Sequence, residues 1–163
     1  MTAPTTSENI EIVMPRSAWL GVLRETTVEV FSIMAGAAVT APETDDCQIV
    51  AYVTGVVSIT GALHATFTLR CSDHSATKVA SQMLGVSMDE AAAQKGDAIG
   101  EICNMIVGHF KLKIGHGGTC EMTIPSVIVG GNYRIHSEAP EQRLQFPMIY
   151  EGEPMWFALD IRK

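Results

Sequence analysis

The sequence has 163 residues, of which 47% are hydrophobic and 18% are charged. This length and balance are typical of one folded globular domain rather than of a disordered chain. Its 11 basic and 18 acidic residues give a net charge of −7, spread along the chain. That distribution argues against a nucleic-acid-binding surface, because such a surface needs clustered basic residues.

The four cysteines, Cys47, Cys71, Cys103 and Cys120, are far apart and form no CxxC pair. Such spacing is typical of reduced, mostly buried thiols in a cytosolic protein. The first residues lack the basic end and apolar run of a signal peptide. The sequence has no run of about 18 apolar residues, so no membrane span is predicted. We therefore expect a soluble cytoplasmic protein that makes no contact with a membrane.

The chain is predicted to begin with a flexible tail, residues 1–14, because this part is polar and contains prolines. One folded domain, residues 15–163, is expected to follow. Its first part predicts a helix, two strands and two helical stretches, over about residues 18–35, 48–59, 62–70, 73–85 and 87–114. The candidate N-caps of these helices are Ser17, Ser72 and Ser87.

The remainder of the chain predicts strands over residues 120–129, 133–136, 143–150 and 155–162. In the strands predicted at residues 62–70 and 155–162, apolar side chains occupy every second position, which places them on one face of each strand. A short connection, residues 151–154, joins the last two strands and predicts an antiparallel hairpin. Helices and hairpin strands in this order are typical of an α+β fold. We expect an antiparallel β-sheet with helices packed on it.

A short internal repeat aligns residues 29–36 with residues 101–108. Each copy begins with Glu, carries a small polar residue three positions later and a Gly four positions after that. Each copy also precedes strand-like sequence. The match involves residues that are common in helices, so duplication and chance both stay open.

The most informative stretch is residues 97–108, with the sequence DAIGEICNMIVG. A helix advances about 100° per residue, so Asp97, Glu101, Asn104 and Gly108 fall on one narrow stripe. The opposite side is apolar and is expected in the core; it consists of Ile99, Ile102, Ile106 and Phe110. Asn104 has no proton to lose, but its amide both donates and accepts hydrogen bonds. That chemistry suits orienting a water toward a phosphoryl group, while Glu101 is suited to pairing with a partner's cation.

Plainer interpretations of these residues stay open. A polar stripe is also typical of the solvent side of any amphipathic helix, and its glycines are typical of close packing. His109, His116 and Cys120 suggest zinc, but no spacing here makes the three or four ligands that zinc needs converge. A nucleophilic pair of Cys103 and His109 is disfavoured, because Cys103 points toward the buried side of the helix.

Residues 97–108 resemble the signature helix of the CheX/CheC/FliY chemotaxis phosphatases and are most similar to that of CheX-like domains. Downstream, residues 124–130 (IPSVIVG) resemble the proline-containing strand, ending in glycine, that follows this helix in the family. The order of the elements fits the family from about Arg16 to the end, and the specific match covers residues 97–130. The intervening run of residues 109–116 has no residue-by-residue match and is assigned no role.

The resemblance implies a CheC-like fold and a protein phosphatase that hydrolyses the aspartyl phosphate of a CheY-like response-regulator receiver. It implies that Glu101 binds the receiver's active-site lysine and that Asn104 enters the receiver's active site to orient the attacking water. The family's Mg²⁺ sits in the receiver, so no cofactor is expected on this chain. The resemblance further implies a homodimer. One active site is expected per chain, because the first helix carries Glu29 but has Ser32 where an asparagine would be needed.

A non-catalytic receiver-binding or scaffold module of the same fold is the alternative function, since fold alone does not decide activity. The pair of Glu101 and Asn104 favours the enzyme. A scaffold has no need of a carboxamide at that position.

Overall fold

The computed structural model describes residues 13–44, 46–131, 133–134 and 138–163. Nearly all of the predicted tail, residues 1–14, lies outside this part of the chain. The predicted strand at residues 133–136 also lies half outside it, and its two described residues, Tyr133 and Arg134, belong to no strand.

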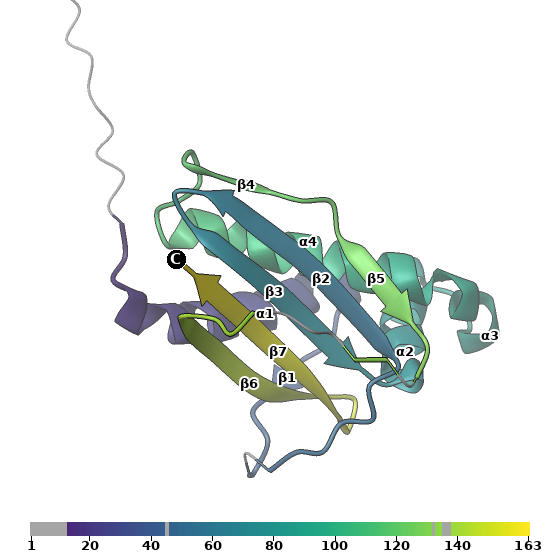
Figure 1. Ribbon diagram of the computed structural model, residues 1–163. Coiled ribbons are helices and arrows are strands. Elements are labelled where there is room, and N and C mark those ends of the chain that lie inside the picture. Colours follow the sequence, from purple (N-terminus) through teal and green to yellow (C-terminus); the bar gives the residue numbers. More distant parts are fainter. Residues whose placement is uncertain (1–12, 45, 132, 135–137) are drawn as a thin grey trace, which may run out of the picture.

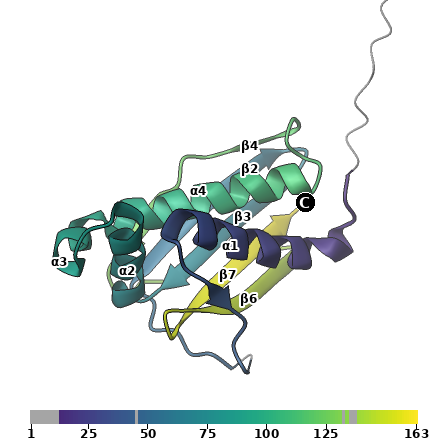
Figure 2. The same cartoon turned by 180° about the vertical axis from the view of Figure 1, so that it is seen from behind.

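The protein is built from two layers: a seven-stranded sheet and a set of helices that cover one of its faces (Figures 1 and 2). The helices are η1 (Arg16–Ala18), α1 (Trp19–Ala35), α2 (Asp73–Leu84), α3 (Met88–Ala91), η2 (Ala92–Gln94) and α4 (Lys95–Lys113). The strands are β1 (Val39–Thr40), β2 (Val53–Gly61), β3 (His64–Cys71), β4 (Cys120–Met122), β5 (Ser126–Val129), β6 (Gln142–Tyr150) and β7 (Glu153–Arg162). All strand pairs are antiparallel, so the predicted α+β fold is confirmed.

The order of the strands supports the internal repeat. The sheet runs β1-β6-β7-β3-β2-β4, and β5 also pairs with β2. Both α1-β1-β2-β3 and α4-β4/β5-β6-β7 consist of a helix, an edge segment and a hairpin. The edge segment of each half pairs with the outer hairpin strand of the other half: β1 pairs with β6, and β4 and β5 pair with β2. The two edges of the sheet therefore have the same arrangement of strands. The helices α2 and α3 are inserted between the two halves.

The predicted apolar faces form the core between the two layers. The apolar side of α4 is fully buried, as predicted: Ile99, Ile102, Ile106 and Phe110. In β3 and β7 every second side chain is buried, which confirms the predicted alternation. Burying one large apolar side chain contributes about 1.5–3 kcal/mol, so this set of contacts fixes α4 against the sheet.

Two of the three predicted helix caps are confirmed. The hydroxyl of Ser72 accepts a hydrogen bond from the backbone N–H of Ser75 at 3.0 Å, and Ser87 caps α3 through the N–H of Glu90 at 3.3 Å. The prediction for Ser17 is wrong, because this residue lies inside η1, a turn that continues directly into α1. The N-cap of α1 is Ala18, which makes no side-chain cap.

The strand boundaries differ from the prediction where pairing partners end. The expected strand over residues 48–59 begins only at Val53, because its partner β3 ends at Cys71, which pairs with Val53. The expected strand over residues 120–129 is two strands with a break before β5. Pro125 lies in that break, and a proline has no N–H for a ladder hydrogen bond. The two-residue strand β1 was not predicted, because it is too short to show alternation.

Candidate functional site

The helix α4 carries the predicted site residues on a firmly packed base. It packs against α1 and α2 on the helical side and against β2 on the sheet side (Figure 2). The approach to β2 is close, because a Cβ atom at Gly55 would lie only 2.5 Å from Sγ of Cys103. Glycine at position 55 therefore allows α4 to lie directly on the strand, which fixes the orientation of the opposite, polar side of the helix.

The predicted stripe lies on the outer side of α4. Asp97 and Glu101 are exposed, and Asn104 is half-buried. Glu101 and Asn104 are three residues apart in a continuous helix, so their Cβ atoms are about 5–6 Å apart on one face. Gly108, at the end of the stripe, is half-buried, and a Cβ atom there would lie 3.8 Å from Sδ of Met122. The structure thus brings together a carboxylate and a carboxamide that an approaching protein can reach.

A groove of about 610 Å³ runs between α4 and the segment that contains β5. We call it the α4 groove; it is lined by Gly96, Asp97, Gly100, Glu101, Ile124, Pro125, Val127 and Val129. Its floor is close-packed at Gly100, where a Cβ atom would lie 3.4 Å from Val127 and 3.6 Å from Pro125. Gly96 and Gly100 therefore face the β5 segment rather than another helix, and the groove ends beside Glu101.

A second groove lies at the equivalent place in the other half of the molecule, between α1 and β1. We call it the α1 groove; it is lined by Arg24, Glu25, Val28, Val39, Ala41, Pro42, Pro147 and Met148, and has a volume of about 380 Å³. The repeat aligns Glu29 with Glu101, a shift of 72 positions, so Arg24 and Val28 occupy the places of Gly96 and Gly100. The α1 groove is therefore narrowed by side chains that the α4 groove lacks.

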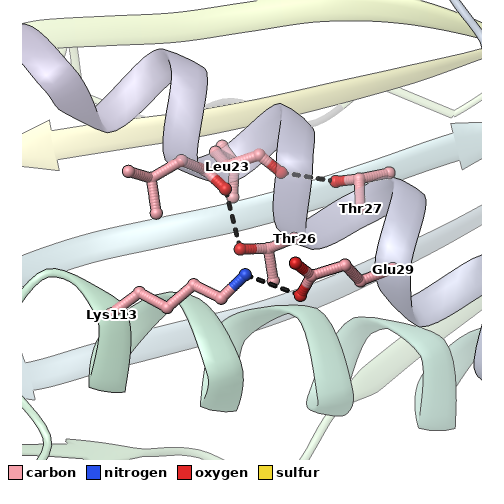
Figure 3. A network of polar contacts seen from close by, with 6 residues as sticks. Leu23, Thr26, Thr27, Glu29 and Lys113 are labelled. Carbon is pink, nitrogen blue, oxygen red and sulfur yellow. Dashed lines mark hydrogen bonds and ion pairs between the residues drawn. The ribbon is translucent and has the colours of Figure 1, made fainter.

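The two glutamates of the repeat have different surroundings. Glu29 accepts a hydrogen bond from Nζ of Lys113 at 2.6 Å, and this ion pair joins α1 to α4 (Figure 3). Among the described residues, neither Glu101 nor Asp97 takes part in an ion pair. Lys95 stands nearby in the sequence, but its ammonium contacts Asp73 at 2.6 Å and lies 5.6 Å from the ring centroid of Tyr52. The acidic side chains of the α4 groove are thus available to a cation from outside.

The cysteines take no part in this site. Cys71, Cys103 and Cys120 are buried and Cys47 is half-buried, and all four are free thiols, which confirms the prediction of reduced, mostly buried cysteines. Burial raises the pKa of the Cys103 thiol far above its usual range. A nucleophilic role for Cys103 is therefore disfavoured, because the reactive form is the thiolate.

Within the described ranges, no three His, Cys, Asp or Glu side chains gather in a group that could hold a metal ion. This disfavours a zinc site built from His109, His116 and Cys120. The same part of the chain contains no helix that is both long and apolar enough to cross a membrane.

The family model described as chemotaxis phosphatase CheX matches residues 53–148, more than half of the chain. The chain belongs to the CheX family. It is 34% identical over 87 residues to the CheY-P phosphatase CheX of Thermotoga maritima, a match that covers 50% of this chain and 54% of that protein. The chain thus spans about half the length of the curated relative that it matches.

Solved structures of CheX family relatives share the fold. A CheC-like superfamily protein from a Shewanella species has a TM-score of 0.75 at 18% identity, over 92% of this chain and 100% of that one. A CheX-CheY-BeF3-Mg²⁺ complex from Borrelia burgdorferi gives 0.74 at 18% identity, over 89% and 98%. These likenesses confirm the predicted CheC-like fold.

The α4 groove itself was not predicted from the sequence. Residues 124–129 are strongly apolar, which is typical of a buried strand, yet Ile124 is 88% exposed and Val129 is 48% exposed. From the sequence, Gly100 and Gly108 indicate close helix packing and not a groove. Gly96 and Gly100, four residues apart on one face, are the signal from which a groove along α4 could have been inferred.

Proposed function

We propose that this protein hydrolyses the aspartyl phosphate of a CheY-like receiver domain, with Asn104 orienting the attacking water and Glu101 binding the receiver's active-site lysine. The observation that carries the proposal is the pair itself: a carboxamide beside a carboxylate that forms no ion pair with any described residue, both on the outer side of α4. Membership of the CheX family supports it, as does the likeness to a named CheY-P phosphatase.

In the proposed hydrolysis, this protein forms no covalent bond with the phosphoryl group. The oxygen of a water attacks phosphorus, the bond between phosphorus and the aspartyl oxygen breaks, and inorganic phosphate, a free aspartate carboxylate and a proton are released. The amide of Asn104 would hold that water in line by donating and accepting hydrogen bonds. Correct positioning alone lowers the barrier of such a step substantially.

Glu101 has a separate role in this proposal. Its carboxylate is exposed and has no ion-pair partner in the described part of the chain, so a charge-assisted hydrogen bond to the receiver's lysine would fix the register of the two proteins. The Mg²⁺ ion that offsets phosphoryl charge is proposed to belong to the receiver, and this chain is proposed to bind no cofactor. A homodimer stays a prediction from the family resemblance, and a cytoplasmic location stays a prediction from the cysteine spacing and the sequence pattern; sedimentation of the purified protein tests the first of them.

The test is the decay of a phosphorylated receiver, measured with wild type, Asn104→Ala and Ser32→Ala. The receiver is loaded with acetyl phosphate and Mg²⁺, and each receiver of the same cell is tried in turn. Alanine is well tolerated on this side of a helix, so Asn104→Ala should keep the fold and its circular dichroism spectrum. It should lose about 100-fold or more of the accelerated decay, since misplacing the attacking group is that costly.

Ser32→Ala is the matched control, because Ser32 occupies the equivalent position on α1. It should leave the rate unchanged. Equal rates for Asn104→Ala and wild type would remove Asn104 from the mechanism. A wild-type protein that binds phosphorylated receivers without accelerating their decay would instead establish the scaffold alternative.

A further inference from the structure

We infer that the α4 groove is the surface on which the receiver docks, and that it accepts a receiver segment in which a basic side chain is flanked by apolar ones. In this inference Ile124 and Asp97 add affinity and specificity to the register that Glu101 fixes, while Asn104 serves the reaction. The inference rests on the proposed function and adds the residues that hold the receiver in place before the chemistry.

The first observation is that the α4 groove is kept open by missing side chains. The equivalent residues on α1, Arg24 and Val28, line a smaller groove, and the guanidinium of Arg24 lies over the ring of Phe146 at 5.4 Å from its centroid. At Gly96 a Cβ atom would meet only Val127 and Val129, both at 3.8 Å. A Cβ atom would thus fit there without a clash, so close packing does not require glycine at position 96.

The second observation is the apolar wall opposite these glycines. Ile124 is 88% exposed and Val129 is 48% exposed, although both lie in a short segment next to the core. Exposed apolar area costs about 25 cal/mol per Å² relative to burial, so the isolated fold gains little from a large aliphatic residue at position 124. A contiguous exposed apolar surface rimmed by charged residues is typical of an interaction site.

The third observation is the charge of the groove. Its titratable lining residues are Asp97 and Glu101, both acidic and both exposed. Lys95, on the preceding turn, is directed to Asp73 and to the ring of Tyr52 and does not neutralise them. A partner that presents basic groups is therefore complementary, whereas a second copy of this acidic groove would be repelled.

The geometry of the helix separates the roles of the two carboxylates. Asp97 precedes Asn104 by seven residues, which is about 10 Å along the helix axis. If Asn104 reaches the phosphoryl group, Asp97 is too far away to contact the same site. Asp97 must then meet a different basic group, on the receiver surface outside its active site. This assigns Asp97 to the choice of partner rather than to the reaction.

The test separates affinity from turnover. Ile124→Ser and Asp97→Asn are compared with Ile33→Ser, which removes an equally large aliphatic side chain that is 70% exposed on α1. Initial rates of receiver dephosphorylation are measured over a range of receiver concentrations. We expect Ile124→Ser to raise KM about tenfold, which corresponds to about 1.4 kcal/mol, because the apolar contact of Ile124 with the receiver is lost, and to leave kcat unchanged. Asp97→Asn should raise KM less, and its effect should shrink with added salt.

Binding is also measured directly, by titrating each variant with the receiver. The inference holds if Ile124→Ser weakens binding and Ile33→Ser does not, even where the wild type fails to accelerate decay; that result would refute the proposed function alone. The inference would be overturned if Ile124→Ser and Asp97→Asn both kept the KM and the affinity of the wild type. If Asn104→Ala were inactive in the same experiment, the proposed function would remain intact. A change of oligomeric state in Ile124→Ser without a change in KM would assign the groove to a second copy instead, which also overturns the inference.

Discussion

The α4 groove and the α1 groove are built alike and differ in a few side chains. In both, a helix packs beside a short edge segment of the sheet, and the two helices are related by the internal repeat. On α1 the repeat has Arg24, Val28 and Ser32, where α4 has glycine, glycine and asparagine. Glu29 is held by Lys113, whereas the glutamate of α4 is in no ion pair within the described chain.

This difference separates what the fold needs from what the site needs. Both helices keep a buried apolar side, because each half of the sheet needs a cover. The α1 groove shows that the fold accepts larger side chains and an ion pair at its surface. The open groove and the carboxylate of α4, which has no ion-pair partner among the described residues, are therefore not consequences of folding, and our proposal assigns both to recognition. Three sets of variants break or sharpen this comparison.

The largest effect is expected when the α4 groove is given the side chain of its counterpart, by Gly96→Arg. The new side chain would fill the groove and place a positive charge beside Asp97 and Glu101. KM for the phosphorylated receiver should rise well over tenfold, since both apolar and ionic contacts are lost. Gly96→Ala is the control: it removes glycine from a helix, which stabilises the fold by up to about 1 kcal/mol, and should leave KM near that of wild type. A Gly96→Arg variant with unchanged kinetics would show that the receiver does not use this groove.

An intermediate effect is expected when the two glutamates are compared. Glu101→Ala should weaken receiver binding about tenfold, with a smaller loss of rate at saturating receiver, because an unpaired carboxylate is removed from the interface. Glu29→Ala should leave receiver binding unchanged and lower the free energy of unfolding by about 0.5 kcal/mol, since its ion pair with Lys113 is partly exposed. Binding titrations and urea unfolding of both variants check this. Equal affinity in wild type and Glu101→Ala would refute the role given to that residue.

The smallest effect is expected from supplying the missing carboxamide on α1. Ser32→Asn, made in the inactive Asn104→Ala background, should restore no phosphatase activity, because Glu29 is already paired and the α1 groove is narrowed by Arg24 and Val28. The measurement is receiver decay against the Asn104→Ala parent. Recovered activity would show that the asparagine alone separates the two halves, and that the grooves do not matter.

The parts of the molecule that depend on local spacing could be predicted from the sequence. The helix α4, its buried isoleucines and the outward position of Glu101 and Asn104 follow from a period of 3.6 residues. Ser72 and Ser87 were recognisable as caps because a cap is a local contact. The alternation in β3 and β7 marked their buried faces correctly.

The parts that depend on distant pairing could not be predicted. The start of β2 is set by where β3 ends, and β1 exists because it pairs with β6 across more than 100 residues of chain. The ion pair of Glu29 and Lys113 joins residues 84 positions apart. The α4 groove forms only when the segment after α4 folds back along it, so the exposure of Ile124 has no local signature.

The close approach of Gly55, in β2, to Cys103, in α4, determines where the polar side of α4 lies relative to the sheet. Any side chain at residue 55 would meet the sulfur of Cys103 and the methyl of Ile99 and push α4 outward. Because Gly55 has no Cβ atom, α4 can lie close to β2, and this distance determines how far Asn104 projects from the protein surface. Substitutions at positions 55 and 103 are constrained to compensate for each other in size, although neither residue can touch a receiver.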